Sequence, residues 1–342
     1  MSSQTISITP KRRDSNMELL RIVSMLLVLV VHADYLSLGS PTPGDAVAHP
    51  TESIIKALVY SLSTVCVNCF VLLSGWYGIR PKLRRFAEFI FQILFICGVT
   101  MLGYLVITHS KPDTADIKSL LLLTDDLWFV RSYIILYLFA PALNAFSSWA
   151  SHRQFIWVLT GLFLFQSIYG WAFVIVPWFD GGYSPLSFML LYLLAQYIRR
   201  YPSKLTRLSS RWYLLLYLIL TIFGGFISFF SLYYGIGEGM AWLSYISPIV
   251  ILNSVVLLLF FSKLSLKSKA VNWIACSCFA VYLLHCTRHV LDAYCSHVRE
   301  YYQAQHYEGI ILLIVSVYVS AILLDKARIW VWHMVSQRND NK

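Results

Sequence analysis

The first hydrophobic run of the chain carries two side chains that could do chemistry, the guanidinium of Arg21 and the imidazole of His32. Eleven helical residues at about 100° each return to within about 20° of the starting direction, so the two side chains share one helix face. At about 1.5 Å per residue they lie about 16 Å apart along the axis. Such residues inside a membrane run normally face a bundle interior or a wet cavity. We therefore expect both to line a cavity; the alternatives are snorkelling of Arg21 and a packing contact of His32.

A second set of polar residues follows the hydrophobic part of the run at 271–291. These residues are His285, Arg288, His289 and Asp292. Their spacing of i, i+3, i+4 and i+7 would place them on one continuous helical stripe. His285 and His289 could bind a metal together with Asp292, but no strong ligand from another helix is evident. We predict no metal site and instead a stripe that lines a wet, outward-open cavity.

The run at 127–147 opens with Trp128 and Arg131. Trp128 suits the membrane interface. Arg131 lies about one turn inside the outer boundary, where a preceding Asp could neutralise its charge. A structural ion pair and a substrate contact both fit this position. Trp128 and Arg131 could share the outward-open cavity with the polar stripe.

The composition defines the elements that must position these residues. The chain has 342 residues, of which 58% are hydrophobic and 13% charged. A soluble protein would carry about twice that charge. The hydrophobic residues form about ten runs of about 20 residues, which predicts an all-α polytopic membrane protein because only helices and closed barrels satisfy their backbone in lipid. The predicted spans are 17–37, 54–76, 86–107, 127–147, 154–176, 184–198, 212–234, 241–262, 271–291 and 308–332.

The basic residues predict the orientation of these spans. With both termini cytoplasmic, 21 of the 27 Lys and Arg residues lie on the inner side, as the positive-inside rule requires. The chain then divides into an inner tail at 1–16, a transmembrane region at 17–332 and an inner tail at 333–342. This asymmetry accounts for the net charge of +10 without a nucleic-acid partner. In this arrangement His32 and His285 each lie about fifteen residues into spans that start inside, so they share a depth.

The chain resembles the acyltransferase-3 family of bacterial integral-membrane acyltransferases over most of its length. The most specific match is the Arg-x10-His pattern of Arg21 and His32. The other matches are Phe70-Val-Leu-Leu-Ser74-Gly75-Trp, Leu127-Trp128-Phe129-Val-Arg131, Leu136-Tyr-Leu-Phe-Ala-Pro141-Ala-Leu-Asn144 and Tyr282-Leu-Leu-His285. Two departures are Cys286, where the family often has Pro, and Asn68-Cys69, where it often has an aromatic or hydrophobic residue.

The resemblance implies transfer of an acyl group, usually acetyl, from cytoplasmic acyl-CoA to a hydroxyl of an envelope glycan or lipid-linked sugar. The enzyme would be a multi-pass protein of the bacterial cell membrane, with acetyl-CoA as a substrate and no permanently bound cofactor. Arg21 would hold donor phosphate. The outward-open cavity would receive the acceptor, and its predicted lining is Trp128, Arg131, His285, Arg288, His289 and Asp292. His32 would act as general base or accept the acyl group itself. Transfer of succinyl or another acyl group stays open, as does a non-enzymatic polysaccharide exporter, although no internal repeat or broken helix is evident.

Overall fold

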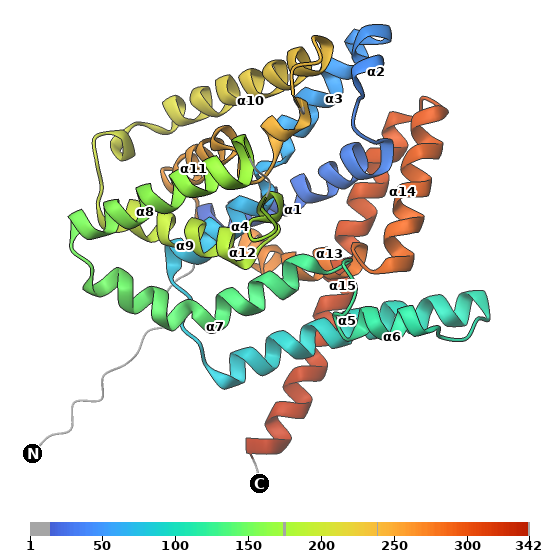
Figure 1. The fold of residues 1–342 in the computed structure, drawn as a ribbon. Helices are drawn as coiled ribbons and strands as arrows, with labels where there is room; N and C mark the ends of the chain where they lie inside the picture. The colour runs from blue at the N-terminus through green and yellow to red at the C-terminus, as the bar shows by residue number, and fades with distance from the viewer. Residues whose placement is uncertain (1–13, 174–175, 238, 341–342) are drawn as a thin grey trace, which may run out of the picture.

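The computed structural model describes residues 14–173, 176–237 and 239–340, and the described part of the chain folds into helices without strands (Figure 1). This agrees with the predicted all-α class. The elements are α1 (Ser15–Val31), η1 (His32–Leu38), α2 (Pro43–Ala48), α3 (Pro50–Ser63), α4 (Val65–Tyr77), α5 (Leu83–Thr108), α6 (Thr114–Leu120), α7 (Trp128–Trp149), α8 (His152–Gln166), η2 (Ser167–Ala172), η3 (Asp180–Gly182), α9 (Pro185–Arg200), η4 (Leu205–Arg207), α10 (Ser210–Tyr233), η5 (Gly239–Leu243), α11 (Pro248–Ser262), α12 (Lys269–Ala275), α13 (Cys278–His285), α14 (Arg288–Gln303) and α15 (Tyr307–Asp340).

Eight helical segments of the described chain are long and apolar enough to cross a membrane, and a bent pair of helices would make a ninth. The protein is therefore a multi-pass membrane protein. The remaining predicted span, at 184–198, corresponds to α9, which has 16 residues. That length is just below the usual minimum of about 17 residues for a span.

Helix α1 lies inside the bundle and packs against α3, α4, α11, α12 and α13. One side of it is buried along its length, through Leu20, Ser24, Val28 and Val31. Helix α4 is buried along almost its whole length, and at Gly75 it lies so close to the backbone of Tyr192 in α9 that a Cβ would clash. Close helix approach at a small residue is the usual way in which membrane helices pack without a hydrophobic driving force.

The predicted continuous span at 271–291 is wrong. The helical segment Lys269–His285 ends at His285, and α14 leaves it at an angle of 86°. The backbone of Thr287 is extended, with φ −69° and ψ 140°, so the helix cannot continue through it. Beyond Thr287 the sequence is amphipathic and rich in polar residues, and α14 returns alongside η1 and α15. The polar stripe is therefore divided between two helices.

The two chain ends were predicted to be inner tails. Residues 1–13 lie outside the described residues, so most of the predicted tail at 1–16 is not described. Helix α15 continues without a break through most of the predicted tail at 333–342 and ends at Asp340. The cytoplasmic orientation of both ends stays a prediction.

Candidate functional site

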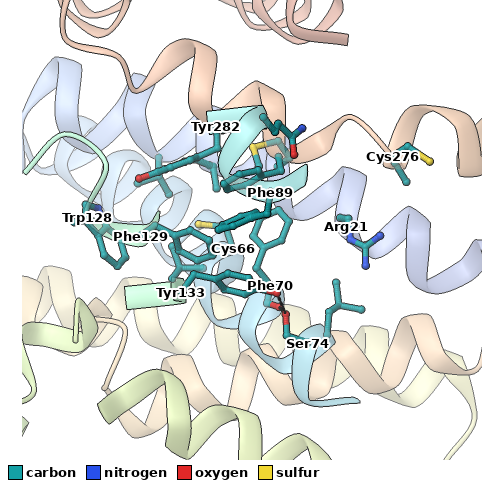
Figure 2. Close-up of a pocket in the computed structure, with 18 of the residues that line it drawn as sticks. Arg21, Cys66, Phe70, Ser74, Phe89, Trp128, Phe129, Tyr133, Cys276 and Tyr282 are labelled. Atoms are coloured by element: carbon teal, nitrogen blue, oxygen red, sulfur yellow. Dashed lines mark hydrogen bonds between the residues drawn. The ribbon is translucent and has the colours of Figure 1, made fainter. Parts of the chain in front are cut away.

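A cavity of about 450 Å³ lies among helices α1, α4, α5, α7 and α13, and both Arg21 and His32 line it. Figure 2 shows Arg21 at one side of this cavity and Trp128 at the other. The structure thus brings the residues of the Arg-x10-His pattern to one internal space. Helix α1 ends at Val31, one residue before His32, where the wider π-helix η1 begins. Such π-helical turns are frequent at functional sites.

Aromatic side chains form much of the wall between the two ends of the cavity. The ring of Phe89 stacks on Phe279 with centroids 5.2 Å apart, and Phe129 stacks on Tyr133 at 5.7 Å. Tyr282 packs against Phe129 at 5.5 Å. All five residues line the cavity. A passage with such walls fits a thin, flexible, mostly apolar chain better than a hydrated ion.

The end of the cavity near Arg21 carries charged groups. Arg21 forms an ion pair with Glu18, one helical turn before it. Arg328 of α15 also lines the cavity, is only 3% exposed and pairs with Asp325 at 2.8 Å. Glu88 lies 3.4 Å from the same guanidinium. Arg328 is one of the 21 basic residues predicted to lie on the inner side. Its burial had a signal in the sequence, since Asp325 and Arg328 stand at i, i+3 inside the last hydrophobic run.

The imidazole of His32 hydrogen-bonds a second imidazole. Nδ1 of His32 lies 3.0 Å from Nε2 of His285. Nδ1 of His285 lies 2.6 Å from the carbonyl oxygen of Val281. His285 is fully buried and does not line the cavity, so it contacts His32 on the side of the ring that faces away from the cavity. On the other side Ser37 donates a hydrogen bond of 2.6 Å to the carbonyl oxygen of His32.

These contacts assign the tautomer of each ring. A carbonyl oxygen only accepts, so Nδ1 of His285 must carry a hydrogen. A buried imidazolium without a carboxylate would be costly, so we take His285 as neutral, with the lone pair on Nε2. Nδ1 of His32 must then donate to that lone pair, and the free lone pair of His32 lies on Nε2. No described residue hydrogen-bonds Nε2 of His32, which leaves it able to accept a proton.

A family model described as an acyltransferase domain matches residues 14–325. The chain belongs to the acyltransferase-3 family. The match covers nearly the whole chain and includes Arg21, His32 and His285. No curated protein and no solved structure matches this acyltransferase.

The structure separates the residues predicted to line an acceptor cavity of this acyltransferase. Trp128 lines the same cavity as His32 and contacts Tyr183 with ring centroids 4.3 Å apart. Tyr245 also lines this end of the cavity and was not predicted as a site residue from the sequence. Arg131 does not line the cavity and pairs with exposed Asp125 at 2.6 Å, which is the structural alternative considered above.

The three residues of the polar stripe after the bend do not line this cavity either. Arg288 lies 3.0 Å from Asp113, and His289 lies 2.7 Å from Asp116, so both connect α14 to the start of α6. Asp292 is exposed on α14. With His285 pointing to His32 and His289 to Asp116, the alternative of a metal bound by His285, His289 and Asp292 does not hold. A role of these residues in acceptor binding stays a prediction.

Charged and aromatic side chains connect α6 and its N-terminal residue Asp113 to α14. The backbone N–H of Asp116 and then the Arg288 guanidinium hold the pKa of Asp113 below its ordinary value. The ring of His289 also stacks on Tyr104, with centroids 3.6 Å apart. We call Asp113, Asp116, Arg288 and His289 the α6–α14 latch, since they join these helices.

Proposed function

We propose that this acyltransferase moves an acyl group, most simply acetyl, from cytoplasmic acyl-CoA to a hydroxyl of an envelope polysaccharide or lipid-linked sugar in the bacterial cell membrane. The observation that carries the proposal is the hydrogen-bonded series from Val281 to His285 to His32 at a cavity that also contains Arg21. Membership of the family supplies the acyl-transfer chemistry, so the exporter alternative is not needed. Transfer of succinyl or another acyl group is distinguished by the test below.

The donor enters at the Arg21 end in this proposal. A guanidinium presents a planar fork of donors that matches phosphate, and acyl-CoA carries phosphates at one end of its pantetheine arm. His32 lies about 16 Å further along the helix, a distance comparable to the extended arm. The aromatic wall between them suits this thin chain. The phosphate competes with Glu18 for Arg21, which is already paired in the absence of donor.

The transfer step uses His32 as a general base. Nε2 of His32 takes the proton of the acceptor hydroxyl as its oxygen attacks the thioester carbonyl, and a tetrahedral intermediate forms. The carbon–sulfur bond then breaks, and the same proton passes from Nε2 to the leaving sulfur, so the products are an ester and free CoA. During this step His32 is an imidazolium, and His285 stabilises it by accepting the hydrogen bond from Nδ1.

The function is tested by the acyl content of envelope glycan in cells with and without the gene. Alkaline release of acids from purified glycan, followed by chromatography, identifies acetate or succinate. We expect ester-linked acetate that disappears when the gene is deleted and returns with the wild-type chain. Unchanged ester content in the deletion strain would contradict a glycan acceptor, and release of succinate would replace acetyl by succinyl. A trapped acyl adduct on His32 would favour the covalent route over the general-base route.

A further inference from the structure

A thiol lies beside the two imidazoles. Sγ of Cys286 is 3.5 Å from Nε2 of His285 and 3.9 Å from Nδ1 of His32. Cys286 is 2% exposed, and it comes directly after His285 at the end of α13. Two nitrogens and one sulfur from two separate helical segments thus meet within 4.8 Å of one another. Within the described ranges no other group of His, Cys, Asp and Glu comes together in this way.

The separations of these atoms fit a tetrahedral metal ion. Zinc binds nitrogen at about 2.0–2.1 Å and thiolate at about 2.3 Å, so two nitrogens around it lie about 3.3 Å apart and a nitrogen and a sulfur about 3.6 Å apart. The two nitrogens here are 3.0 Å apart, and the sulfur is 3.5 and 3.9 Å from them. Each separation therefore needs to change by only about 0.3 Å. We propose that His32, His285 and Cys286 bind a divalent cation of the zinc class, with water from the cavity in the fourth position.

The surroundings of His285 support this assignment. A metal-binding histidine usually donates its second N–H to a carbonyl or carboxylate, which orients the ring. Nδ1 of His285 already donates to Val281, so its Nε2 is the nitrogen available to a metal. Two imidazoles and a thiolate favour Zn²⁺ or Co²⁺, whereas Mg²⁺ and Ca²⁺ require oxygen ligands. The ligand set is therefore selective.

Binding rearranges two protons. The thiol of Cys286 loses its proton to solvent as the sulfur–metal bond forms. The proton on Nδ1 of His32 moves to Nε2 through water in the cavity, so that Nδ1 can bind the metal. One proton per metal ion is released in total. Nε2 of His32 then carries a hydrogen and cannot accept the proton of the acceptor hydroxyl, so the bound metal inhibits acyl transfer. This inhibition, unlike the metal binding itself, rests on the proposed function.

The binding is tested on the full-length protein in detergent, after treatment with a chelator and its removal. The probe is CoCl₂, because a cobalt–thiolate bond gives a charge-transfer absorption in the near ultraviolet, and MgCl₂ serves as the negative control. We expect about one cobalt ion per chain with this absorption. Cys286→Ala and the nearly isosteric Cys286→Ser should both lose the absorption and weaken cobalt binding at least about tenfold. The matched control is Cys66→Ala, which removes an equally buried thiol that lines the cavity and should bind cobalt like the wild type.

Two results would overturn the site. One is the absence of retained cobalt in the wild-type protein, and the other is unchanged binding in both Cys286 variants. A second measurement compares inhibition of acyl transfer by ZnCl₂, with each variant normalised to its own rate without zinc. We expect Cys286→Ser to need at least about tenfold more zinc for half-inhibition than Cys66→Ala. Cobalt binding without any zinc inhibition would leave the metal site intact and contradict the role of Nε2 of His32 in the proposed function.

Discussion

His285 and His289 are four residues apart, yet they have opposite surroundings because the chain bends between them. His285 is fully buried, and its partners are a carbonyl oxygen and a second imidazole. His289 is partly exposed, bonds the carboxylate of Asp116 and stacks on Tyr104. The carbonyl oxygen of Val281 requires a hydrogen on Nδ1 of His285, which leaves the lone pair on Nε2 to accept a hydrogen bond from His32. The bond of His289 to a carboxylate connects two helices and involves no second imidazole. Only the first arrangement prepares a neighbour to accept a proton.

Arg21 and Arg288 show a similar contrast between the cavity and the latch. Arg21 faces the cavity and has one carboxylate partner, Glu18. Arg288 faces away from it and lies near two carboxylates, Asp113 at 3.0 Å and Asp116 at 3.6 Å. A guanidinium between two acids connects the elements that carry them, whereas one with a single local partner can exchange that partner for the phosphate of the proposed donor. The four predictions below separate the chemistry of the cavity from the structural role of the latch.

The largest effect is expected for His32→Ala. Removal of a general base typically costs about 10²–10⁴-fold in rate. The substitution should abolish detectable acylation of glycan, while expression and binding of acyl-CoA stay near the wild-type level. His289→Ala is the matched control, because it removes an imidazole from the latch and should retain most of the activity. Near-normal acylation by His32→Ala would contradict the proposed role of His32 as the general base.

The next largest effect is expected for His285→Gln. Without the acceptor at Nε2, the ring of His32 can turn or adopt the other tautomer, so we expect kcat to fall by about 10–10³-fold. His285 touches no substrate in this proposal, and the KM for acyl-CoA should therefore stay the same. The control is His289→Gln, measured for both constants in membranes with matched protein content. A fall in kcat shared equally by the two variants would indicate a general structural effect rather than positioning of His32.

The sequence predicted the helical class, eight of the ten expected spans and the meeting of Arg21 with His32 at one cavity. These features follow from hydrophobic runs and from the helical period, which are local properties. The shared depth of His32 and His285 also followed from counting residues into each span. The direct contact between His32 and His285 could not be predicted in this way. It requires α1 and α13 to be neighbours, which counting residues along one sequence does not show.

The bend at Thr287 is the reason why the predicted continuous span at 271–291 was wrong. The spacing of the polar stripe predicted one helix, but spacing alone cannot show where a helix ends, and neither Gly nor Pro marks this end. The amphipathic character of residues 288–303 was the available signal, since a membrane span of that composition would expose polar side chains to lipid. Tyr245 was missed for a different reason, because its place at the cavity depends on tertiary packing alone.

Arg21→Lys should give a smaller effect that appears in donor binding. An ammonium keeps the charge but cannot reproduce the planar fork, so we expect the KM for acyl-CoA to rise about tenfold with a smaller change in kcat. Arg288→Lys makes the same exchange in the latch and should leave the KM for acyl-CoA unchanged. Titration of membranes with labelled acyl-CoA measures the affinity directly. Equal donor affinity in Arg21→Lys, Arg21→Ala and the wild type would leave Arg21 as a snorkelling residue.

The smallest effect is expected from the latch itself, in thermal stability and not in catalysis. The pKa of Asp113 lies below its ordinary value because the folded protein stabilises the carboxylate through the Asp116 N–H and Arg288. The unfolded chain therefore takes up a proton at a higher pH than the folded chain does. The contribution of Asp113 to stability is complete above the unfolded pKa of about 4 and is lost as the pH falls through the folded pKa.

Asp113→Asn should accordingly lower the Tm slightly at pH 7, and the difference from the wild type should vanish in acid. The effect is small because the carboxylate is exposed to solvent and screened. Asp292→Asn is the matched control on α14, since its carboxylate is exposed and has no hydrogen-bonding partner among the described residues. It should leave the Tm unchanged at both pH values. Acyl transfer at pH 7 should be the same in all three proteins, because the latch lies outside the cavity. A large loss of transfer in Asp113→Asn would mean that the latch and the histidine pair are coupled through the bend, and that the two regions act as one site.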